Sequence, residues 1–282
     1  MPQPDQNLYI TCPYVQATSP RHDSKYPTSA RPSGTVGYDN FGSGNFTSAT
    51  GFTWQGQDPL LRSIVTATRP GGSGTNAMQL HYWGGPGDSI SETRFDLSAS
   101  YPEIYIRWWL RVPTNFIHQQ QPSASGDNNK LFFIWMDGYS GDGTGASVGW
   151  EYWSDGAGGS QLAVHHTIGN NTGAGPHLGY TPFISVPADR GRWMKLIMRV
   201  KMSSGRTVSD GEIQMWRQWA DEPTPTLKHN EIGVLLPSPS SGGITAFHSG
   251  YFLGACNTGF ASDTDFLIDD VEFSVTPFSE IP

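Results

Sequence analysis

Apolar and polar residues alternate with a period of two along much of the chain, the pattern of strands with one buried face. The clearest run is 103–112, where Arg107 and Trp109 fall between apolar neighbours. Residues 190–222 contain two more runs joined by a polar, glycine-containing loop, which predicts a hairpin. Further strands are expected at residues 63–68, 77–83, 90–95, 131–135, 148–153, 162–168, 244–254 and 266–275. The stretches 169–189 and 221–243 are rich in Gly, Pro, Asn and Ser and are predicted as loops.

The composition favours the same fold class. The 282 residues include 34 Gly and 21 Pro, while only 15% are charged, which is typical of many short strands joined by tight turns. No run of twelve or more residues has a convincing helical period. We therefore predict an all-β protein, a two-sheet antiparallel β-sandwich with about twelve strands.

The N-terminal segment differs from the rest. Residues 1–34 carry no sustained periodicity and are rich in Pro, Ser, Thr and Gln. A segment of this kind is either disordered or an extended arm that becomes ordered by packing on another surface. Its tyrosines favour an arm that docks. We expect an extended N-terminal arm over residues 1–34 and a compact domain over residues 35–282.

Charge and targeting signals limit the partners. The formal net charge is −8, and no Lys/Arg run is present, which argues against nucleic acid as a partner. No apolar stretch has the length of a membrane span, and the first residues, without a basic or an apolar region, lead us to expect no signal peptide. Cys12 and Cys256 are the only cysteines, and two thiols so far apart are more often reduced than paired. These features predict synthesis and folding in a reducing cytoplasm.

Three strings resemble one superfamily. Y-D-N-F-G-S-G-N-F from Tyr38, followed by Trp54, resembles the opening strand of concanavalin A-like, laminin G-like jelly rolls. F-L-I-D-D-V-E-F-S-V at 266–275 resembles their last strand, and the hairpin at 190–222 resembles their W…L…V…D-G-x-I-x-x-W pair. The resemblance covers roughly residues 35–276 and implies a jelly roll. This superfold hosts lectins, glucanases, polysaccharide lyases and capsid-surface domains, so it implies no single function.

Aromatic and charged residues on the outward faces of the expected strands are candidates for sugar binding, because an aromatic plate stacks on a pyranose ring and polar groups bond its hydroxyls. Each of them is also compatible with a purely structural role. If the strands share one sheet, these residues form a groove. The predicted glycan-binding residues are His81, Trp83, Arg107, Trp109, Glu151 and Trp153.

A structural metal site is the second prediction. Asp269 lies on the apolar face of its strand, and a buried carboxylate needs a cation or several donors. The resemblance implies a calcium ion between the first and last strands, which makes Asp39 and Asp269 the candidate ligands. An arginine partner would satisfy Asp269 equally well. The Gly/Asp-rich segment 137–149 lacks the terminal Glu of an EF-hand and is predicted as a plain loop.

Catalytic motifs are weak. The resembled glucanases use E-x-D-x-x-E, whereas Glu151 stands in E-Y-W-S-D-G. The alginate lyase strings R-x-E-x-R and Q-I-H are absent, although Q-L-H occurs at 79–81. We therefore predict a non-enzymatic glycan-binding or structural protein of a phage virion, which contacts a polysaccharide or cell-surface glycan and meets other virion subunits through its arm. The alternative is a secreted polysaccharide lyase that acts on an anionic glycan.

Overall fold

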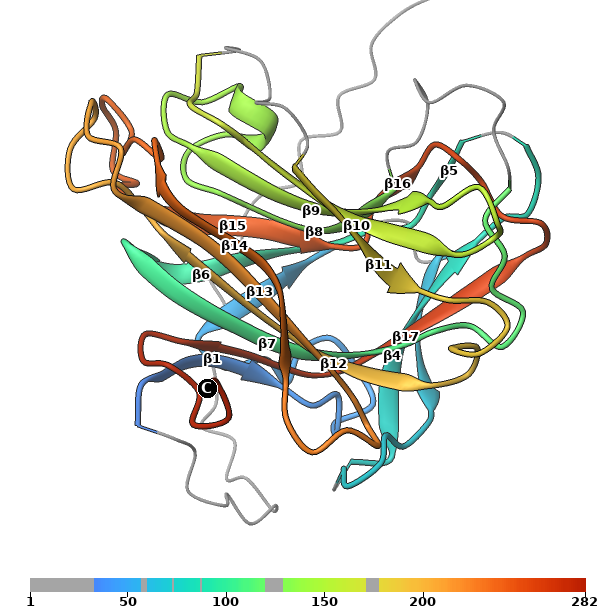
Figure 1. The fold of residues 1–282 in the computed structure, drawn as a ribbon. Coiled ribbons are helices and arrows are strands. Elements are labelled where there is room, and N and C mark those ends of the chain that lie inside the picture. Colours follow the sequence, from blue (N-terminus) through green and yellow to red (C-terminus); the bar gives the residue numbers. More distant parts are fainter. Residues whose placement is uncertain (1–32, 57–59, 73, 87, 120–128, 171–177) are drawn as a thin grey trace, which may run out of the picture. The chain divides into compact units, whose positions relative to one another are not determined.

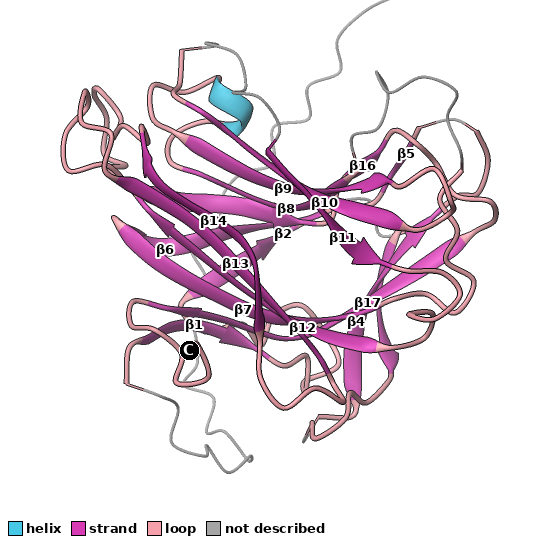
Figure 2. Cartoon of the chain, in the orientation of Figure 1, coloured by secondary structure: helices cyan, strands magenta, loops and turns pink. Residues whose placement is uncertain are grey.

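The computed structural model describes residues 33–56, 60–72, 74–86, 88–119, 129–170 and 178–282. The chain divides into two units, Met1–Arg31 and Pro32–Pro282, and the described residues belong to the second. Almost all of the predicted arm, and with it Cys12, lies outside the described residues. The second unit consists of strands and loops with one short 3-10 turn, η1 (Tyr139–Gly141) (Figure 2).

The larger sheet, sheet A, has the strand order β14-β13-β12-β7-β17-β4-β3, and β1 also pairs with β17. Its strands are antiparallel, and the predicted hairpin forms the pair β12–β13. The bounds in sheet A are β1 Thr35–Asp39, β3 Arg62–Thr66, β4 Asn76–Tyr82, β7 Glu103–Arg111, β12 Trp193–Lys201, β13 Gly211–Trp219, β14 Thr226–Val234 and β17 Thr264–Ser274.

The smaller sheet, sheet B, has the order β11-β10-β9-β8-β15-β6-β2 and lies across the core from sheet A (Figure 1). A separate two-stranded sheet joins β5 and β16. The bounds are β2 Phe52–Gln55, β5 Ser89–Ile90, β6 Thr93–Tyr101, β8 Lys130–Trp135, β9 Ser147–Ser154, β10 Ser160–Thr167, β11 Leu178–Ile184, β15 Phe247–Phe252 and β16 Ala255–Cys256.

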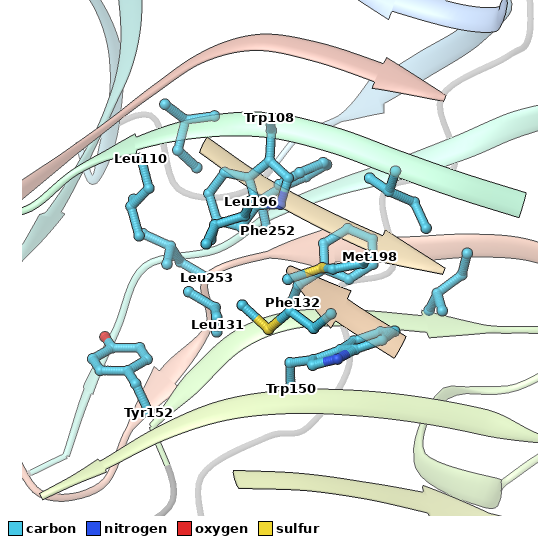
Figure 3. Packing of buried hydrophobic residues seen from close by; sticks show 14 of the residues in the cluster. Trp108, Leu110, Leu131, Phe132, Trp150, Tyr152, Leu196, Met198, Phe252 and Leu253 are labelled. Atoms are coloured by element: carbon cyan, nitrogen blue, oxygen red, sulfur yellow. The ribbon is translucent and has the colours of Figure 1, made fainter. Parts of the chain in front are cut away.

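The core lies between the inner faces of the two sheets. Figure 3 shows Trp108 of β7 and Met198 of β12 packed toward Phe132 of β8, Trp150 of β9 and Phe252 of β15. All five are fully buried, and the rings of Trp108 and Phe252 meet edge to face at 5.1 Å. The alternation of apolar residues along each strand thus becomes two apolar faces in contact, as the strand period requires.

The predicted fold class is confirmed, since two antiparallel sheets form a sandwich. The predicted strand count was too low, because the described residues contain seventeen strands. Two of the missed strands, β11 and β14, end the two sheets and fall in stretches that we predicted as loops. An edge strand has only one strand neighbour and tolerates polar residues and Gly or Pro, so its apolar period is weak. In the described part of the chain, no helix has the length and apolarity needed to cross a bilayer.

Candidate functional site

On the outer face of sheet B, residues of five adjacent strands lie side by side in a row that runs across the strands. The strand register places His165 of β10 beside Gly149 of β9, and Gly149 beside Phe133 of β8. It continues from Phe133 to Tyr251 of β15 and from Tyr251 to Arg94 of β6. Segments distant in sequence are therefore brought onto one surface, which we call the sheet B site.

Glycine at position 149 lets an aromatic ring cross the middle of this row. A Cβ atom at Gly149 would lie 2.2 Å from the Phe133 ring, far inside contact distance. With no side chain there, Phe133 reaches His165, and the two ring centroids are 5.1 Å apart. The Lys130 ammonium lies 5.3 Å from the same ring. Phe133 is thus a fully buried floor between the charged groups of the site.

One half of the site centres on the Glu151 carboxylate. This group is fully buried, and it is bonded by the Lys130 ammonium and by the Trp153 indole N–H at 2.5 Å. His165 Nδ1 lies 3.2 Å from Glu151 Oε1. A buried carboxylate is tolerated when cations and donors surround it, and three groups do so here. Glu151 therefore fixes Lys130 and Trp153 by hydrogen bonds and lies beside His165 on the outer face.

The other half centres on two tyrosines. The Tyr139 and Tyr251 hydroxyl oxygens are 3.3 Å apart, within hydrogen-bond distance. Tyr139 comes from η1, which packs against β8 and β9. Arg94 Nε donates to Glu92 Oε1 at 2.7 Å, and its guanidinium lies 5.9 Å from both the Tyr139 and the Trp135 rings. The tyrosine pair therefore has an arginine and a second carboxylate beside it.

The pKa values of the two tyrosines depend on charged groups from both halves of the site. Burial raises the pKa of Tyr251 well above its ordinary value, and its hydrogen bond with Tyr139 and the negative charges of Glu92 and Glu151 raise that pKa further. Burial also raises the pKa of Tyr139, and there Arg94 opposes the effect of the two glutamates. Both hydroxyls consequently stay protonated near neutral pH and act as hydrogen-bond donors. Because Glu92 and Glu151 act on the same pair, the charged groups of both halves converge on the tyrosines.

The six predicted glycan-binding residues do not form one groove. Glu151 and Trp153 lie in the sheet B site and are bonded to each other. The other four lie on the outer face of sheet A or just beyond the end of β4, on the opposite side of the sandwich. The prediction of a single groove was wrong. Outward-facing residues alternate in the same way in both sheets, so the pattern did not show that these strands belong to different sheets. These four are His81, Trp83, Arg107 and Trp109.

Arg107 and Trp109 face outward on β7 as predicted, but other side chains cover them. The Arg107 guanidinium pairs with Glu272 and with Glu280 at 2.6 Å, and it lies 4.4 Å from the Phe278 ring. Trp109 lies under the guanidinium of Arg69, at 4.9 Å. The C-terminal residues Phe278 and Glu280 therefore cover part of sheet A.

Asp39 and Asp269 are both buried, as predicted, and their surroundings favour an arginine over calcium. Asp39 accepts hydrogen bonds from Phe41 N at 2.8 Å, Ser48 Oγ at 2.8 Å and Trp54 Nε1 at 2.7 Å. Arg69 Nε donates to Asp270 Oδ2 at 2.5 Å, and it also lies 3.9 Å from Asp269 Oδ2. Among the described residues, no group of three or more His, Cys, Asp or Glu side chains is placed to hold a metal. Donor groups around Asp39 and a guanidinium beside Asp269 do not fit calcium coordination by oxygen ligands.

Several residues of the sheet B site were not predicted. Glu92 and Arg94 alternate on one face of the run 90–95, which was a usable signal. Lys130 precedes a nearly continuous apolar run, and Tyr139 stands in a Gly/Asp-rich loop that was predicted as plain. Asp137 shapes that loop by accepting hydrogen bonds from Thr144 N at 2.9 Å and Gly145 N at 2.7 Å. Nothing in the sequence indicates that the loop brings Tyr139 to Tyr251.

Comparison with solved structures gives two informative similarities. One is the marine PL-14 alginate lyase from Aplysia kurodai, at 12% identity and a TM-score of 0.55, covering 77% of this chain and 88% of the other. The second is the alginate lyase vAL-1 from Chlorella virus, at 12% identity and a TM-score of 0.50, covering 79% and 93%. No protein-family model matches the sequence, and no curated protein matches it. The protein has a concanavalin A-like jelly-roll fold. At these identities the similarity shows the fold alone.

Proposed function

We propose that this protein is a polysaccharide lyase that binds a uronate-containing polymer across the outer face of sheet B and cleaves it by β-elimination. The observation that carries the proposal is the convergence of a protonated tyrosine pair with one histidine and two cationic side chains on one surface. These are Tyr139, Tyr251, His165, Lys130 and Arg94. The two solved structures named above are alginate lyases, which supports the choice of substrate class.

A β-elimination on a uronate needs three kinds of group. A cation or donor neutralises the carboxylate, which makes the C5 proton acidic; a base removes that proton; and an acid protonates the departing oxygen. Electrons from the C5–H bond form the C4=C5 double bond while the C4–O bond breaks. The base gains one proton and the leaving oxygen receives one, and no water is consumed.

The residues divide among these roles by charge and protonation state. Arg94, whose side chain is 37% exposed, is the group on this face that binds the uronate carboxylate. The raised pKa values of Tyr251 and Tyr139 suit them to give a proton to the leaving oxygen. His165 serves as the base, and the Glu151 carboxylate, 3.2 Å from its Nδ1, favours the protonated imidazole that forms when the base takes up the proton.

A second candidate is non-enzymatic glycan binding. It is favoured by the pairing of Glu151 with Lys130 and of Glu92 with Arg94, since both carboxylates already have cationic partners. In that case Trp153, Trp135 and the tyrosines form a sugar-binding surface without turnover. On this hypothesis the protein is a glycan-binding component of a phage virion.

One assay separates the two candidates. The full-length chain is incubated with alginate, polyglucuronate, pectate and hyaluronan, and the ultraviolet absorbance of unsaturated uronate products is followed. A lyase produces this absorbance with at least one polymer, and mass spectrometry shows products lighter by one water than hydrolysis products. Binding to a polymer without any such product would overturn the lyase proposal and favour the binding module.

A matched pair of variants ties the activity to the site. Tyr251→Phe removes the hydroxyl that contacts Tyr139, whereas Tyr105→Phe removes a hydroxyl on the outer face of sheet A, where it donates to Glu103 at 3.0 Å. Only the first variant should abolish cleavage. If Tyr251→Phe is as active as the unchanged protein, this hydroxyl takes no part in the cleavage, and the assignment of the active site to the sheet B site is wrong.

A further inference from the structure

The outer face of sheet A contains an open pocket of about 590 Å³, a volume typical of small-ligand sites. Its floor combines apolar side chains of β3 and β17 with polar groups of β4, β7 and the segment after it. The residues that matter for the argument are Gln79, Arg111, Asn115, Asp263, Asp265 and Leu267. It lies on the opposite side of the sandwich from the sheet B site.

The strand register sets these groups in order. Leu267 of β17 pairs with Gln79 on one side and with Arg111 on the other, which forms the floor. Asp265 pairs with His81, two residues further along both strands and therefore on the same face. Trp83 follows His81 on the same face, so it stands about 13 Å from Gln79 by strand geometry. The outward face of β4 therefore leads from the pocket floor to a tryptophan.

Asp265 is held in a fixed arrangement. Its Oδ1 accepts from Gln79 Nε2 at 3.2 Å and lies 2.7 Å from His81 Nδ1. Asp263 is fixed in the same way, because its Oδ1 accepts from Gly84 N at 2.8 Å. The Asp263 backbone oxygen accepts from Asn115 Nδ2, also at 2.8 Å. Planar polar groups oriented in advance in this manner lose little entropy when they bind hydroxyls.

Two further observations point to a ligand. Trp83 is 57% exposed, although its ring packs edge-on against His81 at 4.5 Å, so its remaining surface faces solvent in a fixed orientation. His81 Nε2 is buried and has no hydrogen-bond partner among the described residues. A fixed, exposed indole is uncommon on an unused surface, and a buried ring nitrogen without a protein partner calls for a bound water or ligand.

We propose that this surface is a second glycan-binding site, selective for neutral sugars and separate from the sheet B site. We call it the sheet A site. Apolar atoms of Leu267 and Val65 support the ring of one sugar, while Gln79, Asp265 and Arg111 bond its hydroxyls. Trp83 stacks on a sugar further along the chain. Among the described residues that line the pocket, Asp263 and Asp265 are acidic and Arg111 is the one cation, so a uronate carboxylate is repelled. The proposal does not depend on cleavage at the sheet B site.

Affinity electrophoresis tests this inference. The full-length protein is run through native gels that contain β-glucan, galactomannan, arabinoxylan or alginate. At least one neutral polymer should retard the unchanged protein. Trp83→Ala and Gln79→Ala should each weaken that binding by about tenfold or more, as expected when an aromatic contact or an oriented hydrogen bond is lost. The control Ile232→Ala, an exposed apolar residue on β14, should change nothing.

A sheet B variant separates this inference from the lyase proposal. Arg94→Ala should lose alginate binding and cleavage while it keeps the affinity for the neutral polymer. Trp83→Ala should keep the cleavage of short uronate oligomers. If no neutral polymer retards the protein, or if Arg94→Ala rather than Trp83→Ala removes neutral-polymer binding, the inference is wrong. Binding of proteins alone to this surface would also overturn it, and thermal melts of each variant exclude a loss of folding.

Discussion

The hydroxyls of Tyr139 and Tyr251 meet at 3.3 Å although the two residues are 112 positions apart in the sequence. Tyr139 comes from the loop after β8, and Tyr251 from β15, which lies between β8 and β6 in sheet B. Their rings are 5.7 Å apart, and Tyr251 is almost fully buried. This contact places two raised-pKa hydroxyls between the charged halves of the sheet B site. The function proposed above depends on it more than on any other pair.

Replacing Tyr251 by Phe should therefore affect activity far more than stability. The variant loses one neutral hydrogen bond, worth about 0.5–1.5 kcal/mol of the free energy of unfolding. If the hydroxyl acts as an acid, the turnover number should fall by roughly 10²–10⁴-fold. Steady-state kinetics on uronate polymers, together with urea unfolding, measures both quantities.

The Tyr139→Phe variant serves as the comparison. It removes the other hydroxyl of the same contact, so it should lower stability by a similar amount. A larger loss of turnover in one variant identifies the proton donor. If both variants keep full turnover, neither hydroxyl takes part in the reaction, and the pair is a structural contact.

Asp269 should make the folded protein less stable as the pH rises from about 4 to 7. Burial raises the pKa of this carboxyl to about 7, Arg69 opposes that effect and Asp39 adds to it, whereas the ordinary value is 3.8. Between these values the folded state binds the proton more tightly than the unfolded state does, so the free energy of unfolding falls as the pH rises. Below this window both states are protonated, and above it both are ionised.

The variant Asp269→Asn removes this titration and should flatten the profile. A shift from 3.8 to about 7 corresponds to at most about 4 kcal/mol across the window. Urea unfolding at pH 5 and pH 8 checks the difference, with Asp142→Asn as a control on an exposed carboxylate. If the free energy of unfolding depends on pH in the same way for the unchanged protein and for Asp269→Asn, the carboxyl has the same pKa in the folded and unfolded states.

Excess chelator should leave the melting curve unchanged, because the surroundings of Asp39 and Asp269 favour donor groups and arginine. A calcium ion bound only to the folded state would stabilise it by mass action, so its removal would lower the melting temperature. Arg69→Ala should lower the free energy of unfolding, since it removes the hydrogen bond from Arg69 Nε to Asp270 Oδ2 at 2.5 Å and the cation 3.9 Å from Asp269 Oδ2. A lower melting temperature in chelator would support the predicted calcium ion instead.

The fold was predictable because each strand carries its own evidence. Residues 103–112 alternate so regularly that β7 was placed within one residue, and the hairpin β12–β13 has turn residues at both ends of its loop. Strand β14 was missed because an edge strand has little apolar surface to bury, and its sequence T-L-K-H-N-E-I-G-V resembles a polar loop. Local pattern predicts a strand only where packing demands an apolar face.

The candidate site was only partly predictable, because pattern does not indicate which sheet a strand joins. Trp109 and Trp153 both face outward on aromatic-rich strands, yet β7 belongs to sheet A and β9 to sheet B. Glu151 with Trp153 was predicted as a unit, because i and i+2 share a face of one strand. The contact of Tyr139 with Tyr251 depends on tertiary structure alone, so no local signal could predict it.

The N-terminal arm leads to the last prediction. Ordering a segment without an apolar pattern costs roughly 1–2 kcal/mol per residue in backbone entropy, so contacts with other subunits would have to offset that cost. If the protein is a virion component, deletion of residues 1–34 should abolish assembly into larger particles and leave the sandwich folded, whereas the proposed lyase activity should not depend on these residues. Ser33 and Gly34 accept hydrogen bonds from Thr276 Oγ1 and Val275 N, so a second truncation that starts at Pro32 separates loss of the arm from loss of these bonds. Sedimentation velocity measures assembly, and circular dichroism measures folding. A full-length chain that stays monomeric, and that keeps lyase activity after either truncation, would contradict the role in a virion and favour the secreted enzyme.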